Sequence, residues 1–326
     1  MLGKTIFVYS EQYRVDIGEH VFPTEKYALV RQQLLEGGHV RADELLRPQP
    51  ATEEQLLRVH TREFIDDLKH LRWTYRTMNS ELPLTAAIVN AYILCAGGTL
   101  LACREAVARR CIAVHIGGGF HHAFADHAEG FCYVNDIAVG VRALQAEGSA
   151  HKVFVIDCDL HQGNGTAHIF RDDPNVFTFS IHQENNYPLK QKSDLDIGLE
   201  DFAGDDVYLQ ALGTVIPAKL DAFSPDLILY VAGADPFKYD QLGALRLTKR
   251  GLAFRDRIVV EGCHKRGIPV APVTSGGYAL DPKDTAEIHT NTARECLRVL
   301  GQLKPPVKPA EPGAQPAPTE PEQQPT

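Results

Sequence analysis

Residues 153–166 read VFVIDCDLHQGNGT, an apolar run that changes abruptly into ionisable residues and glycines. Four apolar residues are followed at once by carboxylates, a histidine and glycines. In an extended segment, residues two apart share a face. Asp157, Asp159 and His161 are therefore expected on the same side. Three ionisable groups beside a buried strand are costly to bury unless a metal or mutual hydrogen bonds hold them. We therefore predict a functional turn at the end of a buried strand.

Similar apolar runs recur along the chain and alternate with longer helical stretches. Runs that are apolar on both faces are typical of a parallel sheet covered by helices. The runs are residues 5–9, 112–115, 153–156, 176–181, 227–231 and 268–273. We predict an α/β fold: a single doubly wound domain with a mostly parallel central sheet covered by helices on both faces. Its active site is expected at the carboxyl ends of the strands.

The connections between these runs carry helix signals. Residues 248–266 have a capping residue at one end and a glycine just beyond the other. Residues 84–110 are rich in Ala and Leu. Gly97-Gly98 in that stretch, and Pro217 further along, argue against unbroken helices there.

The 326-residue chain divides into a long folded part and a short tail. Residues 304–326 hold eight of the twenty prolines and contain no aromatic residue, Ile or Leu. Such a segment lacks the apolar surface needed for a core. We predict a folded catalytic domain in residues 1–303 and a Pro-rich disordered tail in residues 304–326.

Charge and cysteine usage exclude several classes of protein. The 33 basic and 42 acidic residues leave a net charge of −9, which argues against a nucleic-acid binder and favours a cationic substrate. The seven cysteines are odd in number and form no C-x-x-C pair, so buried reduced thiols are expected. The apolar run at residues 5–8 is too short for a signal peptide or a membrane span. We expect a cytoplasmic protein with neither a nucleic-acid nor a membrane partner.

Three more polar clusters follow predicted strands: HIGGGFHH (115–122), VAGADP (231–236) and TSGGY (274–278). Adjacent histidines after a glycine run are well placed for proton transfer near neutral pH. Asp235 completes a three-ligand set with Asp159 and His161, and three ligands with open positions are typical of catalytic zinc. Each cluster alone also fits a plainer role: a core hydrogen bond for a histidine, a helix cap for Asp235, or packing for Tyr278.

In this order the clusters resemble the motifs of the zinc-dependent histone deacetylase family, which has the arginase/deacetylase fold. The resemblance covers about residues 4–300. The matching motifs are GGGFHHAFADHAEGFCYVNDI (117–137), DCDLHQGNGT (157–166), AGADPF (232–237) and SGGY (275–278). The spellings HQGNG and SGGY, the early segment HVFP (20–23) and the short chain are most similar to the class IV branch and its bacterial relatives.

The resemblance implies a role for each matching residue. The zinc ligands are Asp159, His161 and Asp235. The catalytic residues are His121, His122, Asp157, Asn164 and Tyr278. In this scheme His122 is general base and then general acid, His121 is oriented by Asp157, and Tyr278 stabilises the transition state. Asn164 stands where class I members carry Asp, so it holds the ring of His122 without a negative charge, and a less basic His122 is expected.

The resemblance also implies a substrate tunnel and a potassium site. The substrate-binding residues are Gly130, Phe131, Tyr187, Leu242, Gly276 and Gly277. The potassium ligands are Asp157, Asp159, His161, Ser180 and Ile181. No carboxylate in residues 76–81 matches securely the rim aspartate with which class I members hold the substrate backbone.

The function implied is a zinc-dependent amidohydrolase that removes acetyl or longer fatty acyl groups from the side-chain amine of lysine in proteins. One alternative is an amidohydrolase of acetylpolyamines or other small acylated amines. Another is a catalytically inactive scaffold that binds acyl-lysine. A binuclear manganese hydrolase is rejected, because Gly163 and Phe237 stand where the second metal needs carboxylates. The oligomeric state is left open.

Overall fold

The centre of the fold is one sheet of eight strands in the order β2-β1-β3-β8-β7-β4-β5-β6, and all its ladders are parallel. It is seen here in a computed structural model that describes residues 1–304. The strands are β1 (Thr5–Val8), β2 (Leu45–Leu46), β3 (Ile112–His115), β4 (Val153–Asp157), β5 (Val176–Gln183), β6 (Leu195–Leu199), β7 (Leu227–Ala232) and β8 (Val270–Thr274). The predicted fold class is confirmed, and all six predicted strands are present.

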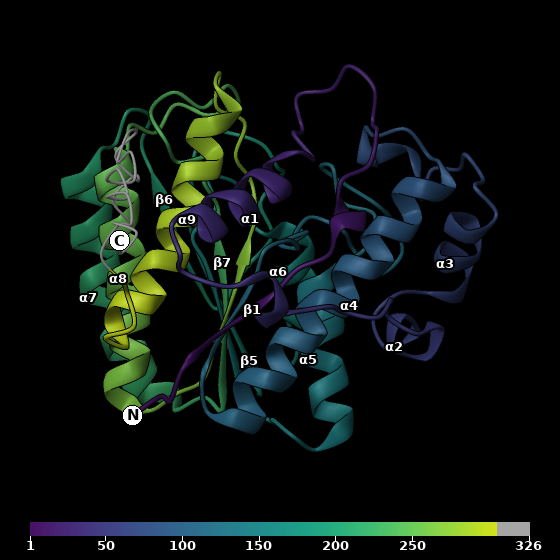
Figure 1. Cartoon of the computed structure of the whole chain (residues 1–326). Coiled ribbons are helices and arrows are strands. Elements are labelled where there is room, and N and C mark those ends of the chain that lie inside the picture. Colours follow the sequence, from purple (N-terminus) through teal and green to yellow (C-terminus); the bar gives the residue numbers. More distant parts are fainter. Residues whose placement is uncertain (305–326) are drawn as a thin grey trace, which may run out of the picture.

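Helices cover both faces of this sheet (Figure 1). They are α1 (Lys26–Glu36), α2 (Glu53–Leu57), α3 (Arg62–Lys69), α4 (Ala86–Arg109), α5 (Asp136–Glu147), α6 (Asn164–Phe170), α7 (Asp205–Phe223), α8 (Lys249–Arg266) and α9 (Pro282–Val299). One layer contains α1, α9, α8 and α7, each packed against the next, and the other contains α4 and α5. The predicted tail, apart from Lys304, lies outside the described residues, so its disorder and the domain boundary at residue 303 stay predictions.

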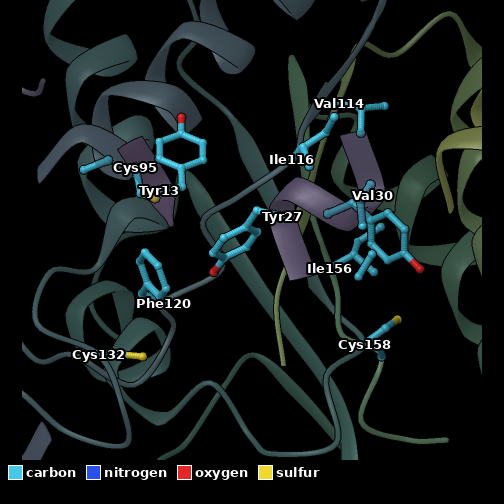
Figure 2. Packing of buried hydrophobic residues seen from close by; sticks show 14 of the residues in the cluster. Tyr13, Tyr27, Val30, Cys95, Val114, Ile116, Phe120, Cys132, Ile156 and Cys158 are labelled. Atoms are coloured by element: carbon cyan, nitrogen blue, oxygen red, sulfur yellow. The ribbon is translucent and has the colours of Figure 1, made fainter. Parts of the chain in front are cut away.

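Alternate residues of the strands enter two hydrophobic cores, one on each face of the sheet. In β4, Val153 and Val155 pack with apolar residues of α4 and α5. Phe154 and Ile156 belong to the other core, which includes Val30 of α1 (Figure 2). Both faces are buried, and this explains why the strand reads as a continuous apolar run rather than an alternating one.

Helix α4 runs unbroken through Gly97-Gly98, so the expected interruption is wrong. A Cβ on Gly97 would overlap the backbone of Gln49, and one on Gly98 would overlap Tyr13 and His115. The glycines are therefore sites of close packing, and the helix tolerates them at roughly 1 kcal/mol each. Burial outweighs that cost, because most residues of the helix are buried.

Helix α7 likewise continues through Pro217, against expectation. A proline inside a helix costs about 3 kcal/mol. The helix buries Leu212, Ile216 and Leu220 in the core, and burial of apolar side chains of this size contributes roughly 1.5–3 kcal/mol each. Packing of this stripe holds the helix together despite the proline.

The two edge strands, β2 and β6, were not predicted. β2 has only two residues, and β6 exposes Asp196 and Gly198 between partly buried neighbours. Edge strands lack the two buried faces that make a central strand recognisable in sequence.

All seven cysteines are buried and free, as expected for reduced core thiols. Helix α4 meets the length and hydropathy criteria for a membrane span, but 72% of its most apolar window is buried inside the fold. It is a core helix here.

Candidate active site

The four predicted polar clusters meet at one end of the sheet. The strands before them are neighbours in the order β3-β8-β7-β4, and their parallel direction brings their carboxyl ends together. His122, Asp159, Asp235 and Tyr278 each follow a different one of these strands. The site therefore occupies the crevice expected of a doubly wound sheet.

Asp159, His161 and Asp235 form a buried group whose ligand atoms all lie within 4.8 Å of one another. Nδ1 of His161 lies 3.4 Å from Oδ1 of Asp159 and 3.2 Å from Oδ2 of Asp235. Burial and the nearby Asp159 charge raise the pKa of Asp235 to about 7. A divalent cation relieves this repulsion, and two carboxylates with one imidazole suit zinc while leaving positions open. The residues present fit the zinc site that the resemblance implies.

Glycines beside this group allow the loops to approach one another. A Cβ on Gly233 would stand 2.5 Å from Oδ2 of Asp159, and one on Gly276 would overlap the Asp235 carboxylate. The backbone N–H of Gly276 donates to Asp159 at 2.9 Å. Gly277, with φ near +145°, packs against α9. Gly276, one of the three glycines predicted to bind substrate, therefore also supports the metal ligands.

A buried arginine ties together the two loops that carry the ligands. Nη1 of Arg255, on α8, donates to the carbonyl oxygens of Cys158 and Gly233, the latter at 2.5 Å. Its guanidinium also pairs with Asp256 at 2.8 Å. The sequence analysis did not identify Arg255, because nothing in the local pattern of α8 distinguishes it from a solvent-facing residue.

The tandem histidines are adjacent in sequence but have different partners. Nδ1 of His121 lies 2.7 Å from Oδ2 of Asp157, and Nδ1 of His122 lies 2.7 Å from Oδ1 of Asn164. Burial alone lowers the pKa of His121, but the charges of Asp157 and Asp159 raise it to about 9. Burial and the neighbouring imidazoles hold the pKa of His122 well below its usual range.

The start of α5 clamps the tandem-histidine segment from both sides. The Asp136 carboxylate accepts the backbone N–H groups of Gly119 and Phe120 at 3.0 and 2.7 Å. The Asn135 amide donates to the carbonyl oxygen of Ala123 at 2.9 Å. All of these groups are buried, so the position of the two imidazoles is fixed by the end of a helix.

A pocket of about 240 Å³ leads to these groups from the surface. Its lining residues are Glu81, His122, Gly130, Phe131, His161, Asn186, Tyr187, Leu242 and Tyr278. Four predicted tunnel residues, Gly130, Phe131, Tyr187 and Leu242, therefore line one opening together with Tyr278. The Tyr278 ring also packs against Phe131, with ring centres 5.8 Å apart.

A smaller cavity of about 20 Å³ continues behind the metal-ligand group. Its walls include Phe22, Tyr27, Phe120 and Cys132, of which the last three are seen in Figure 2. A separate groove of about 780 Å³ is lined mainly by residues 14–25, and its lining includes none of the residues predicted to be catalytic. His121, His122 and Tyr278 line the narrow pocket or the small cavity instead.

Three charged residues of the site were missed in the sequence. Glu81 lies at the mouth of the narrow pocket, in a stretch where no carboxylate could be matched. Lys26 is fully buried, donates to the Ser275 carbonyl at 2.6 Å, and has its pKa lowered to about 8 by burial. Glu129 accepts a hydrogen bond from Asn164 at 2.7 Å. None of the three directly follows a predicted strand. The pattern that indicated the metal ligands, the tandem histidines and Tyr278 therefore gave no signal for them.

The predicted potassium ligands also lie close together in the fold. Asp157 ends β4, and its ladder partner is Ser180 of β5, which Ile181 follows. Asp159 and His161 come directly after β4. The potassium ion itself stays a prediction.

Comparisons with known proteins agree with this geometry. The model of the histone deacetylase domain family matches residues 20–296. An uncharacterized protein of Picosynechococcus sp. is 39% identical over 87% of this chain and 95% of its own length. Histone deacetylase 2 of Arabidopsis thaliana is 30% identical, over 85% of this chain and 75% of its own. The acetoin utilization protein AcuC of Bacillus subtilis is 31% identical, over 75% and 69%.

A solved structure is also similar, the HD domain of HDA15. It superposes with a TM-score of 0.77 at 25% identity, covering 92% of this chain and 90% of that domain. The likeness to class IV in particular stays a prediction. The matched family model spans most of the chain, and the relatives align over most of their length. The chain therefore belongs to the histone deacetylase family.

Proposed function

We propose that this protein is a zinc-dependent deacylase that hydrolyses the amide between an acyl group and the side-chain amine of lysine in proteins. The observation that carries the proposal is the narrow pocket, which is lined by His122, Tyr278 and His161, and His161 lies beside the other two predicted metal ligands. A pocket of this shape suits a thin, unbranched chain such as a lysine side chain. The membership of the family supports hydrolysis of an acyl amide.

When bound, zinc supplies a Lewis acid for the acyl carbonyl and lowers the pKa of water. Asp159, His161 and Asp235 would hold it. His122 accepts a proton from the attacking water and later gives it to the leaving amine. Its ring is oriented by Asn164, while the ring of His121 is oriented by Asp157. Tyr278 lines the pocket and donates its phenolic hydrogen to the oxygen on which negative charge develops.

The acyl group proposed is acetyl. The cavity behind the predicted ligands measures about 20 Å³, close to the space for one water molecule, and aromatic side chains close it. A long fatty chain has no room there without movement of Phe22, Tyr27 or Phe120. This volume supports the proposed preference for acetyl over longer acyl groups.

A second candidate substrate is a small acylated amine such as an acetylpolyamine. Glu81 at the pocket mouth and the net charge of −9 favour a cationic substrate of either kind. An inactive scaffold is disfavoured, because the proposed ligands, both histidines and Tyr278 are all in place.

The test is a panel of lysine peptides carrying acyl groups from acetyl to myristoyl, assayed beside acetylpolyamines with zinc-loaded protein. Acetyl-lysine peptides are expected to give the highest kcat/KM. The Tyr278→Phe variant is the matched control for contaminating activity. Faster turnover of acetylpolyamines would favour the second candidate, and binding without turnover of any substrate would favour the scaffold.

A further inference from the structure

A carboxylate lies directly behind the amide that holds His122. Nδ2 of Asn164 donates to Oε1 of Glu129 at 2.7 Å, while Oδ1 of the same amide lies 2.7 Å from Nδ1 of His122. The hydroxyl of Tyr187 donates to the same Glu129 oxygen at 3.1 Å. The other Glu129 oxygen lies 3.6 Å from Nε2 of His127. A chain of contacts thus runs from His122 through Asn164 to Glu129.

The chemistry of these groups fixes the direction of every hydrogen bond in the chain. Burial alone raises the pKa of Glu129, but hydrogen bonds from Asn164 and Tyr187 and the nearby His127 hold the pKa below its usual value, so the group is an ionised acceptor at neutral pH. An acceptor-only carboxylate takes the NH₂ side of the Asn164 amide. The amide oxygen then faces His122, and an oxygen that only accepts requires a hydrogen on Nδ1.

The direction of these hydrogen bonds also determines which ring nitrogen of His122 can act as a base. A neutral imidazole with its hydrogen on Nδ1 carries its lone pair on Nε2. His122 lines both the narrow pocket and the cavity behind it. If the amide were reversed, its NH₂ group would donate to Nδ1 and the hydrogen would move to Nε2, which would remove the free base.

We propose that Glu129 is a positioning residue that locks the Asn164 amide in one orientation and thereby sets the tautomer of His122. The proposal rests on the proposed hydrolase function, in which His122 is the base. Asn164 alone cannot perform this task, because both ends of an amide fit a neutral imidazole equally well. This chain has Asn164 where class I members have a carboxylate. Here the carboxylate belongs to Glu129, which acts on His122 through its hydrogen bond with Asn164.

Glu129 also joins the base to the wall of the pocket. One oxygen accepts from both Asn164 and Tyr187, so the residue that orients His122 also holds an aromatic side chain of the narrow pocket. The ring centres of Tyr187 and His122 are 5.3 Å apart.

The experiment compares Glu129→Gln, Glu129→Leu and the control Asp126→Asn, each in the wild-type and Asn164→Asp backgrounds. Asp126 contacts the far side of His127 and does not touch Asn164, so its variant is expected to match wild type. Loss of an outer hydrogen-bond partner of this kind typically costs about 10–100-fold. We expect a loss in that range in kcat for both Glu129 variants, and a smaller rise in KM because Tyr187 also loses its contact. In the Asn164→Asp background, where a carboxylate contacts His122 directly, Glu129→Gln is expected to cause no loss.

An equal loss of kcat in both backgrounds, or no loss in either, would overturn the proposal. A second measurement does not need activity: ¹⁵N NMR of the histidine-labelled protein, with His122→Gln to assign the signal. Wild type is expected to show the Nδ1–H tautomer of His122, and Glu129→Leu a mixture. An unchanged tautomer in Glu129→Leu would reject the role of Glu129. A protein that shows the expected tautomers but hydrolyses no acyl amine would instead reject the proposed function.

Discussion

Nδ1 of His121 lies 2.7 Å from a carboxylate oxygen of Asp157, and this contact separates two neighbouring histidines by function. The nearby carboxylates keep His121 charged, because they raise its pKa to about 9 despite burial. His122 has an amide at the same position, and its pKa is lowered. The two environments push the pKa values of the imidazoles apart, and this suits the proposed roles of His121 as a supporting charge and His122 as the general base.

The first prediction follows from this division. His122→Ala is expected to lower kcat by about 10²–10⁴-fold, because a positioned acid–base group is lost. His121→Ala removes only a neighbouring charge and is expected to lower kcat less. Steady-state kinetics of both variants at equal zinc content is the measurement. If His121→Ala lowered kcat more than His122→Ala, the assignment of His122 as the general base would be reversed.

The second prediction concerns the metal. Asp235→Asn keeps the size of the side chain but removes a charged ligand, so the variant is expected to lose zinc on dialysis against a mild chelator. Asp172→Asn is the control, since Asp172 is exposed and pairs with Arg171 on the surface. Zinc per chain, measured by atomic emission, is expected near one for wild type and the control. Full zinc retention by Asp235→Asn would refute the proposed ligand set.

The third prediction concerns Tyr278. Tyr278→Phe removes one hydroxyl from the pocket, and loss of an oxyanion donor typically costs about 10²–10³-fold in kcat. The ring contacts with Phe22 and Phe131 remain, so the fold and zinc content are expected to be unchanged. If kcat stays normal and only Tm falls, Tyr278 is a packing residue.

The fourth prediction is a pH dependence of stability. His60 is buried, and burial lowers its pKa from 6.5 to about 4 in the folded state. Between these values the unfolded chain binds a proton that the folded chain does not, so stability falls as pH drops from about 6.5 towards 4. At pH 5 this single group is expected to cost about 2 kcal/mol relative to pH 7.

Urea unfolding at pH 7 and pH 5 tests this for wild type and His60→Gln. The variant loses hydrogen bonds to the backbone of Phe124 and Asn135, so it is less stable at both pH values. Its stability is nevertheless expected to change less between them. An equal pH effect in both proteins would assign the acid sensitivity to other groups, such as His115.

The fifth prediction compares two buried helical glycines. Gly98→Ala places a methyl group on Tyr13 and His115 and is expected to break their 2.8 Å hydrogen bond and lower stability. Gly140 has no neighbour closer than 3.5 Å to an added Cβ, so Gly140→Ala is expected to be stabilising by about 0.5–1 kcal/mol. Thermal unfolding of the pair is the measurement. Equal effects of the two substitutions would contradict the packing account.

The predicted metal ligands, the tandem histidines and Tyr278 share one property: each lies in a segment that follows a central strand. Burial on both faces makes such strands visible as apolar runs, and parallel pairing brings their ends to one place. Asp159, Asp235 and Tyr278 could therefore be placed at one site from the chain alone. The edge strands, with one exposed face, left no comparable signal.

The remaining residues depend on packing between distant segments. Asp136 accepts a hydrogen bond from the backbone of Gly119 because α5 begins beside that loop. Arg255 on α8 donates to the carbonyl oxygen of Cys158, which lies 97 residues earlier in the chain. The contact of Glu129 with Asn164 depends likewise on how two loops fold together. Periodicity describes which face a residue occupies, but it does not state which loop the side chain will touch.

The position of β8 has a consequence for how the chain matures during synthesis. Of the strands within residues 1–304, β8 is the last to be synthesised, yet it lies between β3 and β7 in the middle of the sheet. Until Val270–Thr274 emerges, both of those strands have an open edge, and unpaired edges promote association with other chains. Tyr278 and the Gly276 amide that supports Asp159 also arrive only with this segment. A nascent chain that stops before Val270 is therefore both prone to aggregate and unable to complete its catalytic centre.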